Sequence, residues 1–153
     1  MSEKNTKPDV QLDFTPKTRE MFARCEIDDP DQARGATEAE IADMEELLHV
    51  TLPTAYREFL LYAGMFEMDG PFVGSDCFLQ HLPSLQAWFL EYMAGNPVLH
   101  NHEGNWFAFY CHQGYDWAWF YLDDGDNPTV YQYDETMHSS VQKIAKLDDF
   151  FTK

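Results

Sequence analysis

Three histidines and a cysteine have a spacing that is compatible with zinc binding. His100 and His102 alternate along a predicted strand, so their side chains share one face, and Cys111 and His112 close the next predicted strand. Two histidines at i and i+2 with a third from a neighbouring strand can ligate zinc. Histidines in ordinary strands and turns give the same pattern. We favour this simpler interpretation and predict no metal site and no cofactor.

A second group combines carboxylates with aromatic side chains around two predicted turns. Aromatic anchors inside a charged rim have the composition of interface hot spots, so we predict that these residues bind a protein partner. Alternatively, the aromatic side chains belong to the core and the carboxylates only form the turns. The candidate residues are Tyr115, Asp116, Trp117, Trp119, Asp123, Asp124 and Asp126.

The chain lacks the motifs that would place a nucleophile, an acid and a base together. It has no nucleophile elbow, no glycine-rich phosphate loop and no cysteine in a recognisable catalytic context. Asp123 and Asp124 fall in a predicted hairpin turn, where solvated aspartate is usual. Pro128 occupies the position at which a calcium loop needs glycine. We therefore predict no catalytic residues and no enzymatic activity.

The net charge is strongly negative, because 27 acidic residues stand against 10 Lys and Arg and leave a formal charge of −17. No Lys or Arg occurs between Arg57 and Lys143. Such a surface repels nucleic acid and anionic membranes, and it attracts basic proteins with fast, salt-sensitive association. The simpler alternative is that the charge only keeps the protein soluble. Because dense like charges repel each other, we expect moderate salt to raise the thermal midpoint.

Residues 35–64 are predicted to form two helices with a short joint, and the rest of the chain is organised around this hairpin. Thr37 and Glu40 have the spacing of a capping box, which defines the start of the first helix. One face of this helix is apolar and the other is acidic. The apolar stripe is Ile41, Met44 and Leu48 with Leu47 beside it, and the outward acidic face is Glu38, Asp43, Glu45 and Glu46.

The second helix is predicted to begin at Pro53, whose fixed φ suits a first turn, and to end at Gly64 in the left-handed conformation. Arg57 is its only base, whereas a helix that reads DNA needs several. We therefore predict a hairpin that supports the core and does not bind nucleic acid. Its apolar residues, at i, i+3, i+4 and i+7, are Tyr56, Phe59, Leu60 and Ala63.

The remaining residues are predicted to form a mainly antiparallel sheet of about four to six strands and one long helix, which makes the fold class α+β. Residues 77–80 are a predicted strand, residues 82–94 a helix with Trp88 on its core face, and the tail a strand-like segment and a short helix. Four further runs rich in aromatic and β-branched residues are predicted strands, at residues 98–102, 106–111, 117–122 and 129–133.

The third of these runs is apolar or aromatic on both faces, which is more than a solvated face needs. Either helices cover both sides of the sheet, or one side meets a partner.

The order and spacing of the hairpin residues resemble a known family motif. The residues that carry it are Gly35-Ala36-Thr37, Ile41, Glu45, Leu52-Pro53, Tyr56, Phe59-Leu60 and Gly64. They are similar to the SUKH superfamily, which includes fungal cell-wall synthesis regulators and bacterial immunity proteins against secreted toxins. This chain has His49 where the family has a glycine in the joint, and Ala63 where the family has an asparagine. The resemblance implies an α+β fold and a non-catalytic interaction domain.

Resemblance and charge together predict the function. Members of this family are frequently immunity proteins that neutralise a toxin delivered by a neighbouring cell, and the charge favours a basic toxin such as a nuclease. We predict that the acidic face occludes the substrate channel of the toxin. The alternative is a cytoplasmic regulatory adaptor or scaffold of the same fold without a toxin partner. An uncharacterised enzyme ranks third.

Residues 1–14 are predicted to be a flexible N-terminal segment, and residues 15–153 a single domain that opens with a short helix. The start lacks a secretory signal and no apolar run is long enough to span a membrane, so we expect a soluble cytoplasmic protein. The spacing of the three cysteines suggests neither a disulfide framework nor a thiolate zinc site. The apolar stripe of the opening helix is Met21, Phe22 and Cys25.

Overall fold

The computed structural model describes residues 35–65, 75–99 and 103–150. The predictions for residues 1–34 and for His100 and His102 lie outside the described residues. No helix in the described part of the chain is long and apolar enough to cross a membrane. The elements, in chain order, are α2 (Glu38–Leu48), α3 (Thr54–Ala63), β1 (Ser75–Asp76), the 3₁₀ turn η3 (Leu79–His81), α4 (Leu82–Ala94), β2 (Trp106–His112), β3 (Asp116–Tyr121), β4 (Thr129–Asp134), β5 (Gln142–Lys146) and α5 (Leu147–Phe150).

The two helices of the hairpin form as the sequence predicts, although their ends differ from the prediction. Thr37 and Glu40 make the capping box, with the backbone N–H of each donating to the side chain of the other at 2.9 and 3.1 Å. The left-handed residue is His49, with φ 57°, and not Gly64, with φ −77°. Gly64 is needed for a different reason, because a Cβ there would lie 2.6 Å from the carbonyl oxygen of Leu60.

The joint between α2 and α3 is closed by a carboxylate that we predicted to face solvent. Glu45 is partly buried, its Oε2 accepts a hydrogen bond from the backbone N–H of Leu52 at 2.7 Å, and its Oε1 accepts one from Arg57 at 2.9 Å. The outward prediction for Glu45 is therefore wrong. Helix α3 begins at Thr54, one residue later than predicted, with Pro53 as its N-cap.

The sheet has five antiparallel strands in the order β1-β2-β3-β4-β5, a simple meander. The tail forms β5 and α5 as predicted. The predicted strand at residues 77–80 is wrong, and the part of the predicted strand at residues 98–102 that the structure describes, residues 98 and 99, is not a strand either. Residues 77–80 lead into the η3 turn, where the N–H of Leu79 donates to the carbonyl of Gly64 at 2.6 Å. Val98 and Leu99 both donate their N–H to the Asn96 side chain, so this segment is a turn at the end of α4.

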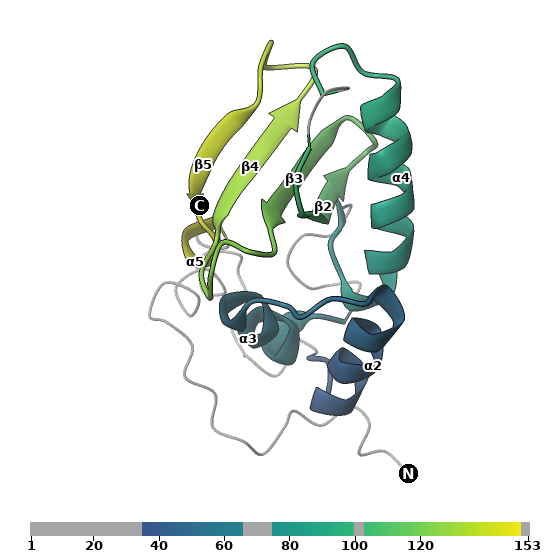
Figure 1. Ribbon diagram of the computed structural model, residues 1–153, viewed down its shortest axis with the longest axis vertical. Coiled ribbons are helices and arrows are strands. Elements are labelled where there is room, and N and C mark those ends of the chain that lie inside the picture. The colour runs from purple at the N-terminus through teal and green to yellow at the C-terminus, as the bar shows by residue number, and fades with distance from the viewer. Residues whose placement is uncertain (1–34, 66–74, 100–102, 151–153) are drawn as a thin grey trace.

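Helix α4 covers one face of the sheet and runs alongside it (Figure 1). The ring of Phe89 lies 5.1 Å from Trp117 and 5.0 Å from Trp119, measured between ring centroids. The Gln86 amide bonds to both backbone groups of Ala108, at 2.6 and 3.0 Å, next to the irregularity in β2. This side chain satisfies backbone groups that the sheet ladder leaves open there, and it fixes α4 on the sheet.

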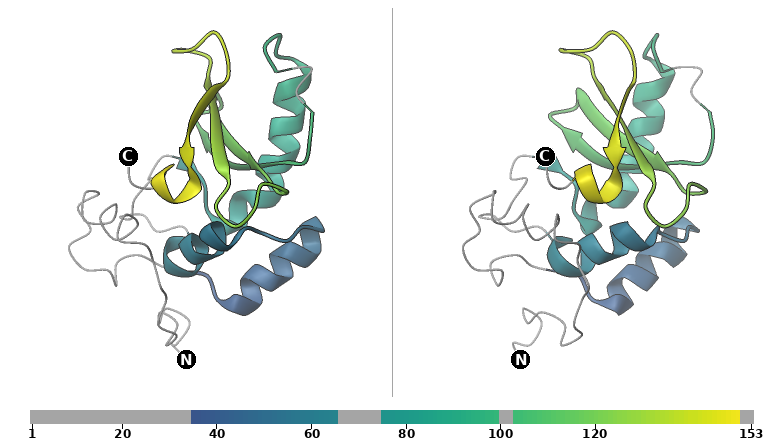
Figure 2. Two further views of the ribbon diagram at one scale, coloured as in Figure 1. Left: turned by 60° about the vertical axis from the view of Figure 1, so that its left-hand side comes forward. Right: turned by 90° about the vertical axis from the view of Figure 1, so that its left-hand side faces the viewer.

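Helices α3 and α5 cover the opposite face. Tyr56 of α3 packs edge-on against Phe107, Phe109 and Phe120 at 6.1, 5.7 and 5.5 Å, and Phe150 of α5 packs on Phe109 at 5.2 Å. The turned views show α4 on one side of the strands and α5 on the other, with α2 and α3 below one end of the sheet (Figure 2). Strand β3 is apolar on both faces, and we gave two explanations for this pattern. The explanation that helices cover both sides of the sheet is confirmed.

Candidate protein-binding surface

The predicted partner-binding residues are divided between the two ends of β3. Tyr115 and Asp116 lie at its start, whereas Asp123, Asp124 and Asp126 follow its end, about 17 Å away along a six-residue strand. Asp116 lies opposite Asp134 in the ladder, and its carboxylate accepts a hydrogen bond from Gln132 at 2.6 Å. The candidate residues therefore do not form one continuous patch. The carboxylates after β3 form a separate group, and Asp116 stabilises the sheet.

The two tryptophans between these ends belong to the core. Trp117 is 3% exposed and Trp119 is 0% exposed. Both rings pack against Phe89 of α4, and Trp119 also stacks on Tyr131 at 6.3 Å. The prediction that these two side chains anchor a partner is corrected by this burial, because a partner cannot reach them while α4 covers the sheet.

The turn between β3 and β4 is held in place from three directions. Asp124 Oδ2 accepts a hydrogen bond from the N–H of Thr129 at 2.9 Å within the turn. The carbonyl of Asp126 accepts from the N–H of Ala55, at the start of α3, at 2.9 Å. Asn127 Oδ1 accepts from the N–H of Asp148 in α5 at 3.1 Å. These bonds fix the acidic turn against two helices, so its carboxylates are presented by a rigid frame.

A shallow hollow of about 180 Å³ lies where this turn meets α3 and α5. It is lined by an acidic residue from each of the three elements, namely Glu58, Asp126 and Asp148, and none of the described residues that line it is basic. Carboxylates arranged in this way suit a lysine ammonium or an arginine guanidinium. We call this site the acidic hollow, and its lining residues are Thr54, Ala55, Glu58, Asp126, Asn127 and Asp148.

Sequence reasoning found only one of the three carboxylates of the acidic hollow. Glu58 follows Thr54 by one helical turn, so its direction is readable from the sequence, and Asp148 lies in the first turn of the predicted final helix. What the sequence does not state is that the β3–β4 turn docks on both helices. On the helices that docking uses the backbone N–H groups of Ala55 and Asp148, which almost any residue type could supply, and only the Asn127 side chain in the turn is specific.

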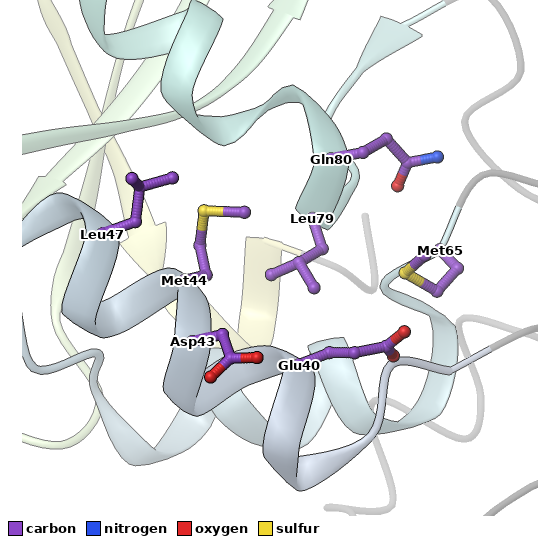
Figure 3. Close-up of a pocket in the computed structure, with 7 residues that line it drawn as sticks. All are labelled: Glu40, Asp43, Met44, Leu47, Met65, Leu79 and Gln80. Atoms are coloured by element: carbon purple, nitrogen blue, oxygen red, sulfur yellow. The ribbon is translucent and has the colours of Figure 1, made fainter.

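A second concave surface lies between α2 and the η3 turn. Met44 of α2 and Leu79 of η3 point toward each other across it, and Glu40 extends along its side toward Met65 (Figure 3). The volume is about 250 Å³, and Leu47 beside it is 62% exposed. We call this site the α2 groove, and its lining residues are Glu40, Asp43, Met44, Leu47, Met65, Leu79 and Gln80.

The sequence profile of the SMI1/KNR4 family (SUKH-1) matches residues 35–153. The match covers the helical hairpin, the sheet and the closing helix. The chain belongs to this family. A search of curated proteins found no match. The members of SUKH-1 include immunity proteins of polymorphic toxin systems, and most are non-catalytic immunity or regulatory proteins.

The residues that carry the SUKH resemblance build the hairpin and do not face the acidic hollow. Ile41, Leu52, Tyr56 and Phe59 are buried in the core. Gly35 is required because a Cβ there would lie 1.8 Å from a backbone carbonyl oxygen of α3. The SUKH motif in this chain is therefore a folding signature. The motif gives no information about a binding surface.

His112, the described member of the histidine group, has a local structural role. Its Nδ1 lies 3.0 Å from Ser75 Oγ, where β1 pairs with β2, and its ring meets Tyr115 edge-on. Among the described residues no group of three potential metal ligands converges. Because His100 and His102 are outside the described residues, the zinc arrangement itself stays untested.

The described cysteines are buried and free, and burial changes their acidity. Desolvation raises the pKa of Cys77 well above its ordinary value and raises the pKa of Cys111 to about 11. A nucleophilic cysteine needs a thiolate, and both thiols stay protonated at neutral pH in the folded chain. Cys77 and Cys111 therefore act as small apolar core residues.

Helix α4 exposes two large apolar side chains, one of which we predicted to be covered. Trp88, predicted on the core face, is 48% exposed, and Leu90 is 60% exposed. The buried residues of α4 are Leu82, Leu85, Phe89 and Met93. Trp88 is exposed because Leu85, Phe89 and Met93, which are spaced at i, i+4 and i+8, form the stripe of α4 that packs on the sheet. Trp88 lies beside this stripe.

Proposed function

We propose that this SUKH-1 chain is an immunity protein that binds a basic nuclease toxin through the acidic hollow and thereby covers the toxin's substrate channel. The observation that carries the proposal is that three acidic residues from three separate elements, Glu58, Asp126 and Asp148, line one hollow. Asp123 and Asp124 lie in the same turn as Asp126 and add to the local negative charge. Family membership supports an immunity role, since SUKH-1 includes immunity proteins.

The chemistry of a nuclease explains why carboxylates would block it. An enzyme that cleaves nucleic acid presents Lys and Arg side chains to the phosphates. Carboxylates accept charge-assisted hydrogen bonds from the same cations, with bidentate geometry where the cation is arginine. An acidic surface placed over the channel therefore occupies the contacts that the substrate phosphates would make.

The hydrogen bonds of the β3–β4 turn favour tight binding. Ala55 and Asp148 hold the turn through their backbone N–H groups, so little conformational entropy is lost when a partner binds. The net charge of −17 steers a basic partner toward the protein, and steered association reaches about 10⁸ to 10⁹ M⁻¹s⁻¹ at low salt. Both effects suit a protein that must intercept a toxin before it reaches its substrate.

The experiment compares two triple variants of the full chain for binding to the toxin that the proposal expects the neighbouring gene to encode. The test variant is Glu58→Gln with Asp126→Asn and Asp148→Asn. The matched control removes the same charge elsewhere, by Glu46→Gln, Glu91→Gln and Glu103→Gln, all of which are exposed. We expect the test variant to bind at least about 100-fold more weakly and to lose protection of nucleic acid from cleavage. The control should stay within a few-fold of the original chain.

Two outcomes contradict the proposal. If both triple variants weaken binding to the toxin equally, binding depends on the net charge of the protein and not on the acidic hollow. Full protection by the test variant would place the interface on another surface. A chain that binds no toxin product and instead retains a different cellular protein would support the regulatory adaptor.

A further inference from the structure

The α2 groove is an apolar surface with an acidic side. Met44, Met65 and Leu79 form its apolar part, and Leu47 stands exposed beside it. Methionine side chains adapt their shape to an inserted group. A cavity of about 150 Å³ is enough to bind a benzene ring, so the 250 Å³ of this groove has room for an aromatic ring together with a second apolar side chain.

We propose that the α2 groove is occupied in cis by residues 15–25 of the same chain. This segment is predicted to be a short helix in which Met21, Phe22 and Cys25 form one apolar stripe. Phe22 supplies the aromatic ring and Met21 the second apolar side chain. The segment lies outside the described residues, and it precedes Gly35, where the described chain enters α2.

The charges of the two surfaces are complementary. Glu40 and Asp43 line the α2 groove, and none of its described lining residues is basic. The proposed segment carries Lys17, Arg19 and Arg24 against one acid, Glu20, in a chain that is otherwise strongly acidic. On a helix, Lys17 and Arg24 lie on one flank of the apolar stripe and Arg19 lies near the other. The basic flank therefore meets the acidic side of the groove when the stripe enters it.

The length of the connection allows this docking. Residues 26–34 separate the segment from Gly35, and nine extended residues span about 30 Å. Glu40, on the side of the groove, lies in the first turn of α2, five residues after Gly35 and therefore at most about 18 Å from it. A tether that comfortably spans two sites gives an effective concentration in the millimolar range, so even weak contacts suffice.

The segment is an addition to the family body, because the SUKH-1 profile begins at residue 35. The inference concerns a different surface from the acidic hollow and does not depend on the proposed toxin. Docking would cover exposed Leu47 and neutralise part of the charge of α2. It would make residues 15–25 a part of the folded protein.

The native thiol of Cys25 permits a direct test on the full chain. Leu47→Cys places a second thiol at the groove, and Ala42→Cys places one on an exposed position of the same helix, turned away from the groove. Cys77 and Cys111 are buried and do not compete. Under mild oxidation by diamide we expect a disulfide within one chain between Cys25 and the residue at 47, in about tenfold higher yield than with the residue at 42.

Amide hydrogen exchange provides the second measurement. Met21→Asp with Phe22→Asp should raise the exchange rates of residues 40–48 in the full chain. Val10→Asp with Leu12→Asp, which changes apolar residues to aspartate outside the segment, should leave them unchanged. Equal crosslinking at positions 42 and 47, or unchanged exchange in the first variant, overturns the proposal. A disulfide that forms only between two chains would show that the groove is occupied by a second copy of the protein. This outcome also overturns the proposal.

Discussion

Arg57 of α3 and Glu45 of α2 form the ion pair that closes the helical hairpin, with Arg57 Nη1 2.9 Å from Glu45 Oε1. The same guanidinium reaches Glu38 Oε1 at 2.6 Å, and the other oxygen of Glu45 accepts the N–H of Leu52 at 2.7 Å. One carboxylate therefore joins α2, the joint and α3. This role explains why a residue of the SUKH motif is charged although it packs inside the hairpin.

Removing this carboxylate should destabilise the protein more than removing an exposed one. Glu45→Ala leaves the N–H of Leu52 and one arm of Arg57 without their partner, so we expect the free energy of unfolding to fall by about 2 to 3 kcal/mol. Glu45→Gln keeps an acceptor and should cost about half as much. The exposed Glu46→Ala is the control, with a change within about 0.5 kcal/mol. Urea unfolding measures all three, and an equal effect of Glu45→Ala and Glu46→Ala would contradict the role of Glu45.

The residue at the end of α2 offers a stabilising substitution. His49 holds φ 57° and ψ 47°, a conformation that costs a residue with a Cβ about 1 to 2 kcal/mol and glycine almost nothing. Because glycine also has more freedom in the unfolded chain, we expect His49→Gly to raise the free energy of unfolding by about 0.5 to 1 kcal/mol. His49→Ala keeps the Cβ and should give no gain. If alanine stabilises as much as glycine, the imidazole and not the backbone is the source of strain.

His49 and Gly64 also show which parts of the fold could be predicted. The capping box of Thr37 and Glu40 depends on residues three apart, and local spacing was sufficient to find it. Glycine is needed at position 64 because Leu60 approaches it closely, and this approach is set by the completed helix. The family resemblance places a glycine at position 49, and the left-handed backbone there supplies the physical reason.

The covering of β3 and the formation of the acidic hollow depend on contacts between residues far apart in the sequence, and local sequence patterns do not show such contacts. Both faces of β3 are apolar, and that pattern alone allows either a second helical layer or a partner. The layer of α4 buries Trp117 and Trp119 and removes them from the surface. The acidic hollow depends on two hydrogen bonds between the β3–β4 turn and the helices. The bond from Ala55 to Asp126 joins backbone groups and leaves no signal in residue type, and the bond from Asp148 to the Asn127 side chain joins residues that are far apart in the sequence.

Salt should stabilise the protein, and the acidic hollow should account for part of the effect. Between about 10 mM and about 300 mM salt the Debye length falls from about 30 Å to below 10 Å, which weakens repulsion between carboxylates. We expect the thermal midpoint to rise over this range. The rise should be smaller for the variant Glu58→Gln, Asp126→Asn, Asp148→Asn than for the control Glu46→Gln, Glu91→Gln, Glu103→Gln. A flat midpoint in the original chain would show that its carboxylates are not crowded.

The buried thiols should be unreactive in the folded protein and should make it sensitive to alkaline pH. In a Cys25→Ser chain, iodoacetamide at pH 8 should label neither Cys77 nor Cys111 until urea unfolds the protein. Rapid labelling without urea would show that one of the thiols is accessible.

The pH dependence follows from the pKa of Cys111, which burial raises from 9.0 to about 11. Between these pH values the unfolded chain has lost a proton that the folded chain retains, so the free energy of unfolding should fall as the pH rises from about 9 to about 11. Cys111→Ala should reduce this slope. Further contributions come from other groups whose pKa values burial raises, namely Cys77, Tyr56, Tyr92, Tyr110 and Tyr121.

Substitution of two tryptophans by alanine should have different effects on stability, because one side chain lies in the core and the other at the surface. Trp119→Ala opens a cavity between Phe89 and Tyr131, and we expect the free energy of unfolding to fall by about 3 to 5 kcal/mol. Trp88→Ala removes a side chain that is 48% exposed and should change stability by no more than about 0.5 kcal/mol. Urea unfolding measures the difference. Similar stabilities for the two variants would mean that α4 does not cover β3 in solution, and Trp119 would then again be a candidate anchor for a partner.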